Sequence, residues 1–210
     1  MENISQAVKV DGPHTEIFGQ NLAGPIEIEN SYKKIVLYEV GPTKIIGHHS
    51  KVEVHGAKGY LDIKDSYSKV EVNNIRGNFL VDGEKLSVLG KTIIGQEISI
   101  SSSYRNVKLS EFSGKTTISL SHGDIVLEPS PLTHPIEVKG KYANIRFSWP
   151  LQGPYPFEAW AKNGDIKWGL PDELSLEEEN GVSTIKAFLQ EKDKPSILLS
   201  TSYGTIRIEN

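Results

Sequence analysis

Two carboxylates recur at the same place in a repeated pattern, and this pairing is the one best suited to catalysis. Asp124 and Asp165 each follow a glycine and precede an isoleucine, and Asn144 holds the equivalent place between them. On successive coils of a stacked fold the two carboxylates would be about 9.6 Å apart, at about 4.8 Å per coil. Inverting glycosidases use roughly 6.5–9.5 Å. Aspartates of this kind also cap tight turns, and we favour that interpretation over a polysaccharide-acting enzyme.

Rings recur three positions before a repeated aliphatic residue and indicate a candidate binding surface. They are Tyr32, His49, Tyr67, Tyr104, His122, Tyr142 and Tyr203. Such a ladder can stack against sugar faces or bind a partner strand. It also stabilises a repeat fold without any ligand, by about 1 kcal/mol for each aromatic pair. We favour the structural interpretation and keep the first six rings as candidate contacts for a carbohydrate or protein ligand.

Lysines stand one residue before the repeated aliphatic residue in the first half of the chain. They are Lys34, Lys51, Lys69 and Lys85. One hypothesis makes them a site for an anionic surface polymer. The favoured interpretation pairs them across strands with Glu53 and Glu71, which stand one residue after the aliphatic residue, on a solvated face.

No metal or cofactor is expected. His48, His49 and His55 are close in sequence, but adjacent residues of a strand point to opposite faces, and zinc usually takes four ligands. The chain has no cysteine, which excludes disulfides, thiolate nucleophiles and cysteine-ligated metals. It also has no glycine-rich phosphate loop and no zinc-protease or serine-hydrolase motif.

A repeat positions all of these residues. Its aliphatic anchors recur once per slightly elastic period and are Ile35, Val52, Val70, Leu86, Val107, Ile125, Ile145, Ile166, Ile185 and Ile206. An apolar residue follows each anchor two positions later, as in a strand with one buried face. A second alternating segment, such as Ile98-Ser99-Ile100, lies about half a period earlier. The pattern predicts an all-β fold, a parallel β-solenoid of about ten coils of roughly 20 residues, rather than an antiparallel meander.

The chain is expected to form one domain over residues 1–210. Residues 1–24 are loosely patterned and are predicted to cap the first coil. Irregular excursions are predicted at 150–160, which is proline-rich, and at 171–195, which contains the hairpin-turn dipeptide Asn180-Gly181. The last anchor segment, Ile206 to Ile208, is predicted to offer a terminal strand edge for self-association.

The repeats resemble a family of bacterial and archaeal adhesin-like domains of unknown function, related to auto-transporter adhesin head domains. The segments that carry the resemblance are Gly123-Asp124-Ile125-Val126-Leu127, Gly164-Asp165-Ile166-Lys167-Trp168 and Tyr203-Gly204-Thr205-Ile206-Arg207-Ile208. The likeness extends over about residues 25–210. It implies a β-helical solenoid, a place outside the cytoplasm and adhesion without a catalytic motif.

The composition limits the classes of partner that the chain is expected to bind. The net charge is −4, so no bulk positive field attracts nucleic acid. No apolar run reaches the about 20 residues of a membrane-spanning helix. The chain is expected at the cell surface or outside the cytoplasm, with a leader or anchor removed, or in the cytoplasm if Met1 is the native start. We expect a non-enzymatic adhesin-like module. The alternatives are a structural or regulatory domain that self-associates through its end coils and, less favoured, a polysaccharide-acting enzyme.

Overall fold

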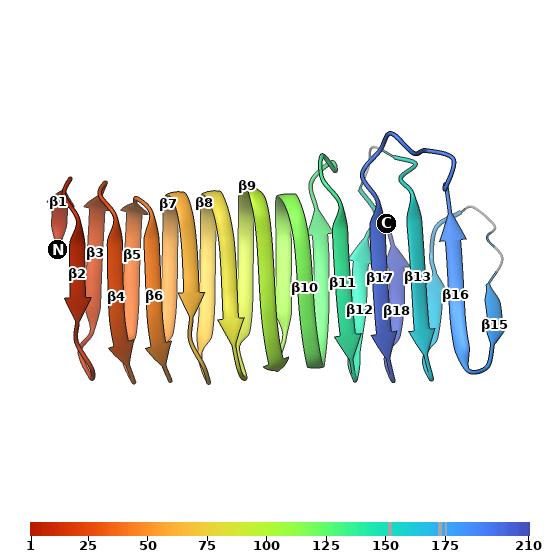
Figure 1. Ribbon diagram of the computed structural model, residues 1–210, viewed down its shortest axis with the longest axis horizontal. Helices are drawn as coiled ribbons and strands as arrows, with labels where there is room; N and C mark the ends of the chain where they lie inside the picture. Colours follow the sequence, from red (N-terminus) through yellow and green to blue (C-terminus); the bar gives the residue numbers. More distant parts are fainter. Residues whose placement is uncertain (151–152, 172–173, 175) are drawn as a thin grey trace.

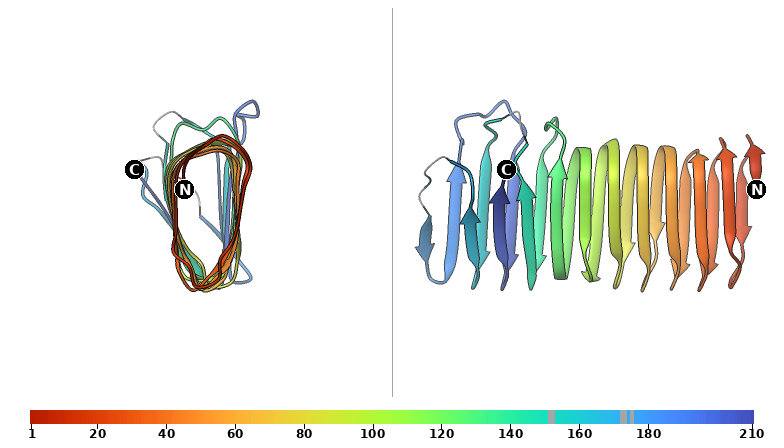
Figure 2. Two further views of the ribbon diagram at one scale, coloured as in Figure 1. Left: turned by 90° about the vertical axis from the view of Figure 1, so that its left-hand side faces the viewer. Right: turned by 180° about the vertical axis from the view of Figure 1, so that it is seen from behind.

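Each coil of the chain carries two strands on opposite sides of a flattened stack (Figure 1). The computed structural model describes residues 1–150, 153–171, 174 and 176–210. Seen from the end of the stack, the coils superimpose and share one narrow oval outline (Figure 2). Coil follows coil through parallel pairing, as between Val52 and Val70. The predicted all-β parallel solenoid is confirmed, and among the described residues no helix is long and apolar enough to cross a membrane.

The strands that hold the anchors form one sheet, here called the anchor face. Among the described residues, six strands lie on this face alone: β1 (Glu2–Ile4), β3 (Ile17–Leu22), β5 (Lys34–Val40), β12 (Ala143–Ser148), β14 (Asp165–Trp168) and β18 (Thr205–Glu209). The long strands β7 (Lys51–Lys64), β8 (Lys69–Gly83), β9 (Ser87–Tyr104) and β10 (Val107–Pro129) run around both faces.

The other sheet is called the opposite face. In the part of the chain that the structure describes, seven strands lie on it alone: β2 (Val8–Asp11), β4 (Ile26–Ser31), β6 (Thr43–His48), β11 (Ile136–Lys141), β13 (Phe157–Lys162), β16 (Val182–Ala187) and β17 (Ile197–Ser202). The short β15 (Glu177–Glu179) pairs antiparallel with β16. β16 in turn pairs antiparallel with β13.

The core is built from columns of like residues, as the period-two pattern predicts. Val52 pairs with Val70, Val70 with Val88, and Val88 with Val107, and all four are buried. Ile125 belongs to the same interior column and pairs with Ile145. Each fully buried aliphatic side chain contributes about 1.5–3 kcal/mol to folding. The stack of coils is therefore held mainly by these columns and by the backbone ladders between them.

One anchor was assigned to the wrong register. Leu86 was predicted to pair in the anchor column, but Val88 occupies that place. Both residues are buried, so the alternation alone does not choose between them. The register places Ser87, rather than Lys85, beside Lys69. Lys85 therefore leaves the predicted lysine stripe.

The coils are not stacked in chain order. β17 pairs with β11 on one side and with β13 on the other, and β18 lies in the same way between β12 and β14. Figure 1 shows this last coil inside the stack rather than at its end. The predicted terminal edge at Ile206 to Ile208 is therefore wrong, because both edges of β18 are paired.

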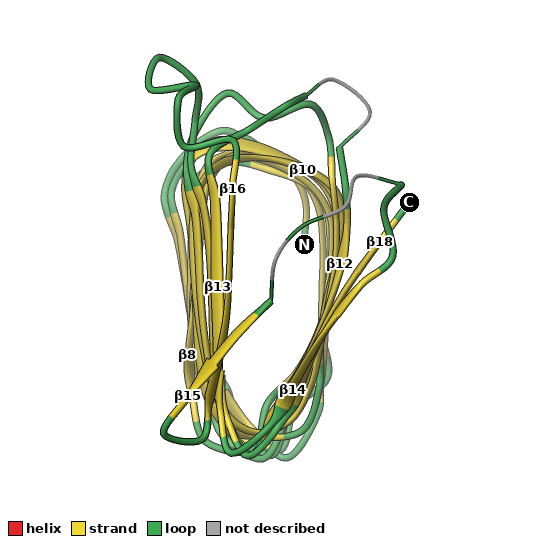
Figure 3. Cartoon of the chain, turned by 90° about the vertical axis from the view of Figure 1, so that its right-hand side faces the viewer, coloured by secondary structure: helices red, strands yellow, loops and turns green. Residues whose placement is uncertain are grey.

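The far end of the stack is formed by the β15–β16 hairpin. Asn180 and Gly181 make its turn, both with positive φ, so the predicted hairpin dipeptide is confirmed. β15 slants across the end of the oval (Figure 3). Ile185 was predicted to anchor a coil, but it pairs antiparallel with Ala159 on the opposite face. The predicted number of about ten coils is approximate for this reason.

The first residues continue the stack. β1 pairs with β3 and β2 with β4, both in parallel, so residues 1–24, predicted as a cap, form coils themselves. The excursion predicted at 150–160 ends in the regular strand β13, and that at 171–195 contains the β15–β16 hairpin. Within these excursions, residues 151, 152, 172, 173 and 175 lie outside the described residues.

Candidate functional site

The rings predicted from the repeat form one column along a narrow edge of the stack. The column runs through His14, Tyr32, His49, Tyr67, Lys85, Tyr104, His122, Tyr142 and Tyr203. The turns that carry these residues join the opposite face to the anchor face, at the lower edge of the stack in Figure 1. All seven predicted rings belong to this ring column.

Backbone geometry fixes the ring column. Tyr32, His49, Tyr67, Tyr142 and Tyr203 all have φ between 54° and 67°, the left-handed region that turns the chain sharply at a corner. Each of them also donates a backbone hydrogen bond to the adjacent coil, as Tyr67 N does to Glu84 O at 2.8 Å. At Tyr104 and His122 the positive φ falls instead on the next residue, Arg105 or Gly123, and the parallel register still places one ring above the other.

The ring faces are turned toward each other. Neighbouring ring centroids are 4.5–5.3 Å apart and the planes are within 6–13° of parallel. Lys85 continues the column between two tyrosines, with Nζ 4.6 Å from the Tyr67 ring centre and 5.9 Å from that of Tyr104. The tyrosines of the column remain 37–54% exposed. The column therefore offers solvent its ring edges and phenol hydroxyls, while its faces are occupied and His122 Nδ1 is buried without a hydrogen-bond partner among the described residues.

Sequence reasoning missed two members of the column. His14 stands three residues before Ile17, which pairs with Ile35 and so extends the repeat by one period. Lys85 stands three residues before Val88. With Val88 as the anchor, the spacings to Val70 and Val107 become 18 and 19 rather than 16 and 21. An even spacing between anchors would therefore have identified both His14 and Lys85 as members of the column.

The predicted lysine stripe is in register over Lys34, Lys51 and Lys69. Glu53 lies 2.7 Å from Lys34 Nζ and 2.6 Å from Lys51 Nζ, and Glu71 pairs with Lys51 and Lys69. The hydrogen bonds from Lys34 and Lys51 lower the pKa of Glu53, and that from Lys69 lowers the pKa of Glu71. The bond to Glu53 raises the pKa of Lys51. The predicted cross-strand pairing is confirmed, and these three cations are matched by carboxylates.

The catalytic spacing predicted for the two aspartates is wrong. Asp124 is in register with Asn144, but Thr205 of the inserted coil comes next, and Asp165 follows Thr205. The carboxylates are thus three coils apart, or about 14 Å at about 4.8 Å per coil, beyond the roughly 6.5–9.5 Å of inverting glycosidases. The spacing that supported an enzyme acting on polysaccharide is lost.

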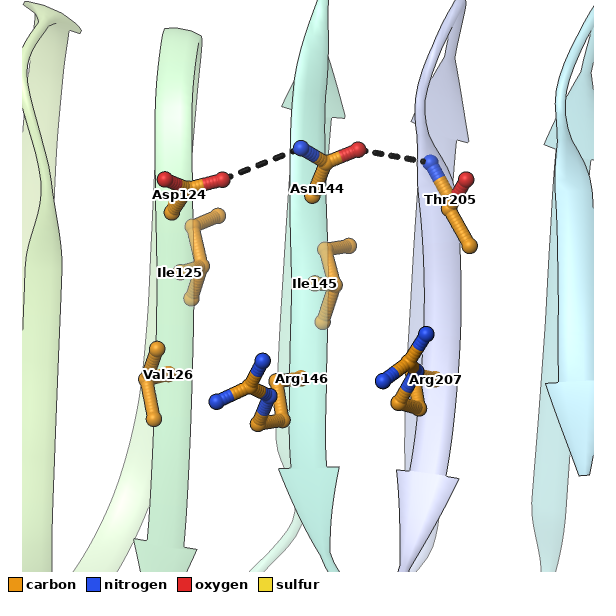
Figure 4. A pocket seen from close by; sticks show the side chains of 8 residues that line it. All are labelled: Asp124, Ile125, Val126, Asn144, Ile145, Arg146, Thr205 and Arg207. Carbon is orange, nitrogen blue, oxygen red and sulfur yellow. Dashed lines mark hydrogen bonds between the residues drawn. The ribbon is translucent and has the colours of Figure 1, made fainter. Parts of the chain in front are cut away.

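A hollow of about 390 Å³ lies on the outer surface of the anchor face, over β10, β12 and β18 (Figure 4). It is named here the anchor-face trough. Its outward side chains are those of Asp124, Val126, Asn144, Arg146, Thr205 and Arg207. Asn144 Nδ2 donates to Asp124 Oδ1 at 3.0 Å, and Thr205 N donates to Asn144 Oδ1 at 3.0 Å. None of these six residues was a predicted ligand contact.

The three clustered histidines are divided between two places. His48 meets His49 of the ring column edge to face at 4.3 Å, whereas His55 stacks on Tyr38 at 5.0 Å on the anchor face. Within the described part of the chain, no three histidine or acidic side chains are grouped so as to hold a metal ion.

No protein-family model, curated protein or solved structure matches this chain. The resemblance to adhesin-like domains therefore stays a prediction.

A buried carboxylate lies behind the ring column. Asp65 is 2% exposed, and its Oδ1 accepts hydrogen bonds from Ser66 N and Ser68 Oγ, both at 2.7 Å. Its Oδ2 has no partner among the described residues. Burial raises the pKa of Asp65 above its usual value, against the opposing effect of the two hydrogen bonds. The fold therefore favours the protonated acid.

Replacing Asp65 by asparagine is expected to stabilise the protein at neutral pH. Because the folded-state pKa is raised, the contribution of Asp65 is present below the unfolded-state pKa and is lost as pH rises through the folded-state value. Asp65→Asn removes that loss, so we expect a gain of about 1–3 kcal/mol at pH 7 that vanishes near pH 4. Urea unfolding at the two pH values measures it. Asp82→Asn, an exposed carboxylate, is the control; an equal effect there, or no gain at pH 7, contradicts the prediction.

Proposed function

We propose that this chain is a non-enzymatic, adhesin-like binding and spacing module that acts at a cell surface or outside the cytoplasm. Its ligand would be an extended carbohydrate or protein segment that lies along the stack. The observation that carries the proposal is the ring column, which runs without a break from His14 to Tyr203. A solenoid has a long regular surface, and such surfaces suit extended partners.

The ring geometry favours one mode of contact. Stacked neighbours already occupy the ring faces, so a sugar ring is not expected to stack there as it does on an isolated aromatic side chain. The exposed edges instead present a polar group about every 4.8 Å. Hydrogen bonds from a regular polymer to this row would be repeated from coil to coil.

Removing only the hydroxyl groups tests this mode of binding. Tyr104→Phe combined with Tyr142→Phe keeps the stacking, so the melting temperature should stay within about 2 °C. Binding to the best ligand on a glycan array should weaken about tenfold, for the loss of two hydrogen bonds.

Tyr38→Phe is the matched control, because Tyr38 stacks on His55 outside the ring column. The proposal fails if no ligand binds the unchanged protein, or if the double variant binds as the unchanged protein does.

Self-association through the end coils is the second candidate, and one observation favours it. The outer edges of β1 and β2 pair with no strand among the described residues, since each has a partner only on its inner side. Unpaired edges favour pairing with another chain. Sedimentation separates the two candidates, since a strict monomer rules out assembly through this end.

A further inference from the structure

Three cationic side chains lie next to one another on the outer surface of the anchor face. Arg146 on β12 is in register with Arg207 on β18, and Arg207 is in register with Lys167 on β14. Like charges directly opposite one another on neighbouring strands destabilise a sheet. Among the described residues, the one ion pair made by this cationic row joins Arg146 Nε to Glu209 Oε1 at 3.5 Å.

The lysine stripe at the other end of the same face provides a comparison. There Lys34, Lys51 and Lys69 are bridged by Glu53 and Glu71. In the cationic row the position next to Arg146 is held by Val126, which is in register with it. In the lysine stripe each carboxylate thus joins two lysines, whereas among the described residues the one carboxylate of the cationic row, Glu209, pairs with Arg146 alone. In the part of the chain that the structure describes, Arg207 and Lys167 make no ion pair, and Arg146 pairs only with Glu209.

The anchor-face trough places hydrogen-bonding groups opposite the arginines. Asp124 and Asn144 stand two residues before Val126 and Arg146 on the same strands, which is about 6.7 Å along a strand. Figure 4 shows the two rows on either side of Ile125 and Ile145, with both guanidinium groups on one side. An occupant therefore meets positive charge at one side and a carboxylate and an amide at the other.

We propose that the anchor-face trough binds a uronic acid residue of an acidic carbohydrate. The sugar carboxylate would lie between Arg146 and Arg207, which can each donate two parallel hydrogen bonds to it. The ring hydroxyls would donate to Asp124 and bond to Asn144. A pyranose ring carries its carboxylate and its C2 and C3 hydroxyls on opposite edges, as the two rows require. Val126 would contact the apolar ring carbons.

The same arrangement disfavours a densely charged polymer. Asp124 and Asp165 lie on the far row and would repel the phosphates that follow one another along a nucleic acid. The net charge of −4 adds to that repulsion. A ligand with one anionic group and several hydroxyl donors can pair with the arginines and also donate hydrogen bonds to the row that contains Asp124 and Asn144.

This inference rests on the proposed function in its choice of a carbohydrate ligand, but it uses none of the ring-column residues. Titration calorimetry of the whole chain with trigalacturonate should show binding, whereas the methyl-esterified trisaccharide should bind at least about tenfold more weakly, for the loss of one charge-assisted contact. Arg207→Gln and Arg146→Gln should each weaken trigalacturonate binding about tenfold.

Arg76→Gln is the matched control, because it removes the same charge from an exposed position outside the trough, and it should change affinity less than about twofold. Without ligand, Arg207→Gln should melt no lower than the unchanged protein, since it removes a like-charge neighbour.

The proposal is overturned if the ester binds as well as the acid, or if the arginine variants bind normally. Tighter binding of a sulfated trisaccharide or of a single-stranded oligonucleotide also overturns it. Loss of binding in the arginine variants, with normal binding in the tyrosine-to-phenylalanine double variant, supports the trough and counts against the ring column. The reverse result rejects the trough alone.

Discussion

A chain that stops at Ser196 is expected to lose the ordered structure of β13, β14 and β16 while the coils before β12 stay folded. The missing segment fills the space between two coils, so its removal leaves β11 and β12 without neighbours on their far side and separates β13 and β14 from the stack. It also removes Ile197, Leu199, Ile206 and Ile208, all buried. Four such side chains contribute roughly 6–12 kcal/mol, comparable to the about 5–15 kcal/mol of a whole domain.

Hydrogen exchange measures this effect region by region. Protection should fall to that of an unfolded chain over β13 and β14 and persist in β7 to β9, because coils of a solenoid contact only their neighbours. Adding the peptide 197–210 should restore protection. The control is a chain without residues 1–12, which loses an end coil and therefore a single interface. Undiminished protection over β13 and β14 in the shortened chain contradicts the coil order.

Phe147→Ala is expected to cost about 3–5 kcal/mol, or roughly 6–20 °C in melting temperature for a domain of this size. Phe147 is fully buried and lies in register between Leu127 of the preceding coil and Ile208 of the inserted coil. Both neighbours belong to fixed backbone ladders. They cannot move into the cavity, so the full cost of the cavity should be observed.

Urea unfolding followed by circular dichroism measures the change in free energy. Leu89→Ala is the control, since Leu89 lies on the same face but is 43% exposed, and its cost should stay within about 0.5 kcal/mol. A loss below about 1 kcal/mol for Phe147→Ala would mean that the two neighbouring coils do not enclose this ring.

The architecture could be predicted from the sequence because each coil repeats the same local pattern. Aliphatic residues two apart, followed by a corner, are enough to specify a wound parallel sheet. The ring column could be predicted from the sequence for the same reason. Its residues lie at the same corner of each coil, and equivalent corners of successive coils must lie above one another.

The order of the coils could not be predicted, because the segment at Ile206 and the one at Ile166 carry the same pattern. Either isoleucine would continue the buried column next to Ile145. Local sequence therefore does not decide which of the two segments pairs with the strand that contains Ile145. The antiparallel strand at Ile185 was assigned to a coil for a related reason, since alternation is identical in parallel and antiparallel strands.

The trough was missed because it exists only through the inserted coil. Arg146 and Arg207 lie on strands that β13 to β17 separate in the sequence, and no spacing in the repeat joins them. The sequence predicts Asp124 and Asn144 only as parts of a catalytic spacing, and the inserted coil makes that spacing longer. The order of the coils therefore creates the trough on this face and removes the spacing that a pair of catalytic carboxylates would need.

The position of β17 and β18 within the stack sets the sequence of events as the chain leaves the ribosome. Coils up to β12 can wind as they are translated, since each meets a partner made one period earlier. The far edge of β12 then stays unpaired until β13 to β17 have been synthesised, because its partner β18 follows them in the chain. Contacts over such separations form slowly, so this newly made edge is expected to be where a chaperone or a wrong strand binds first.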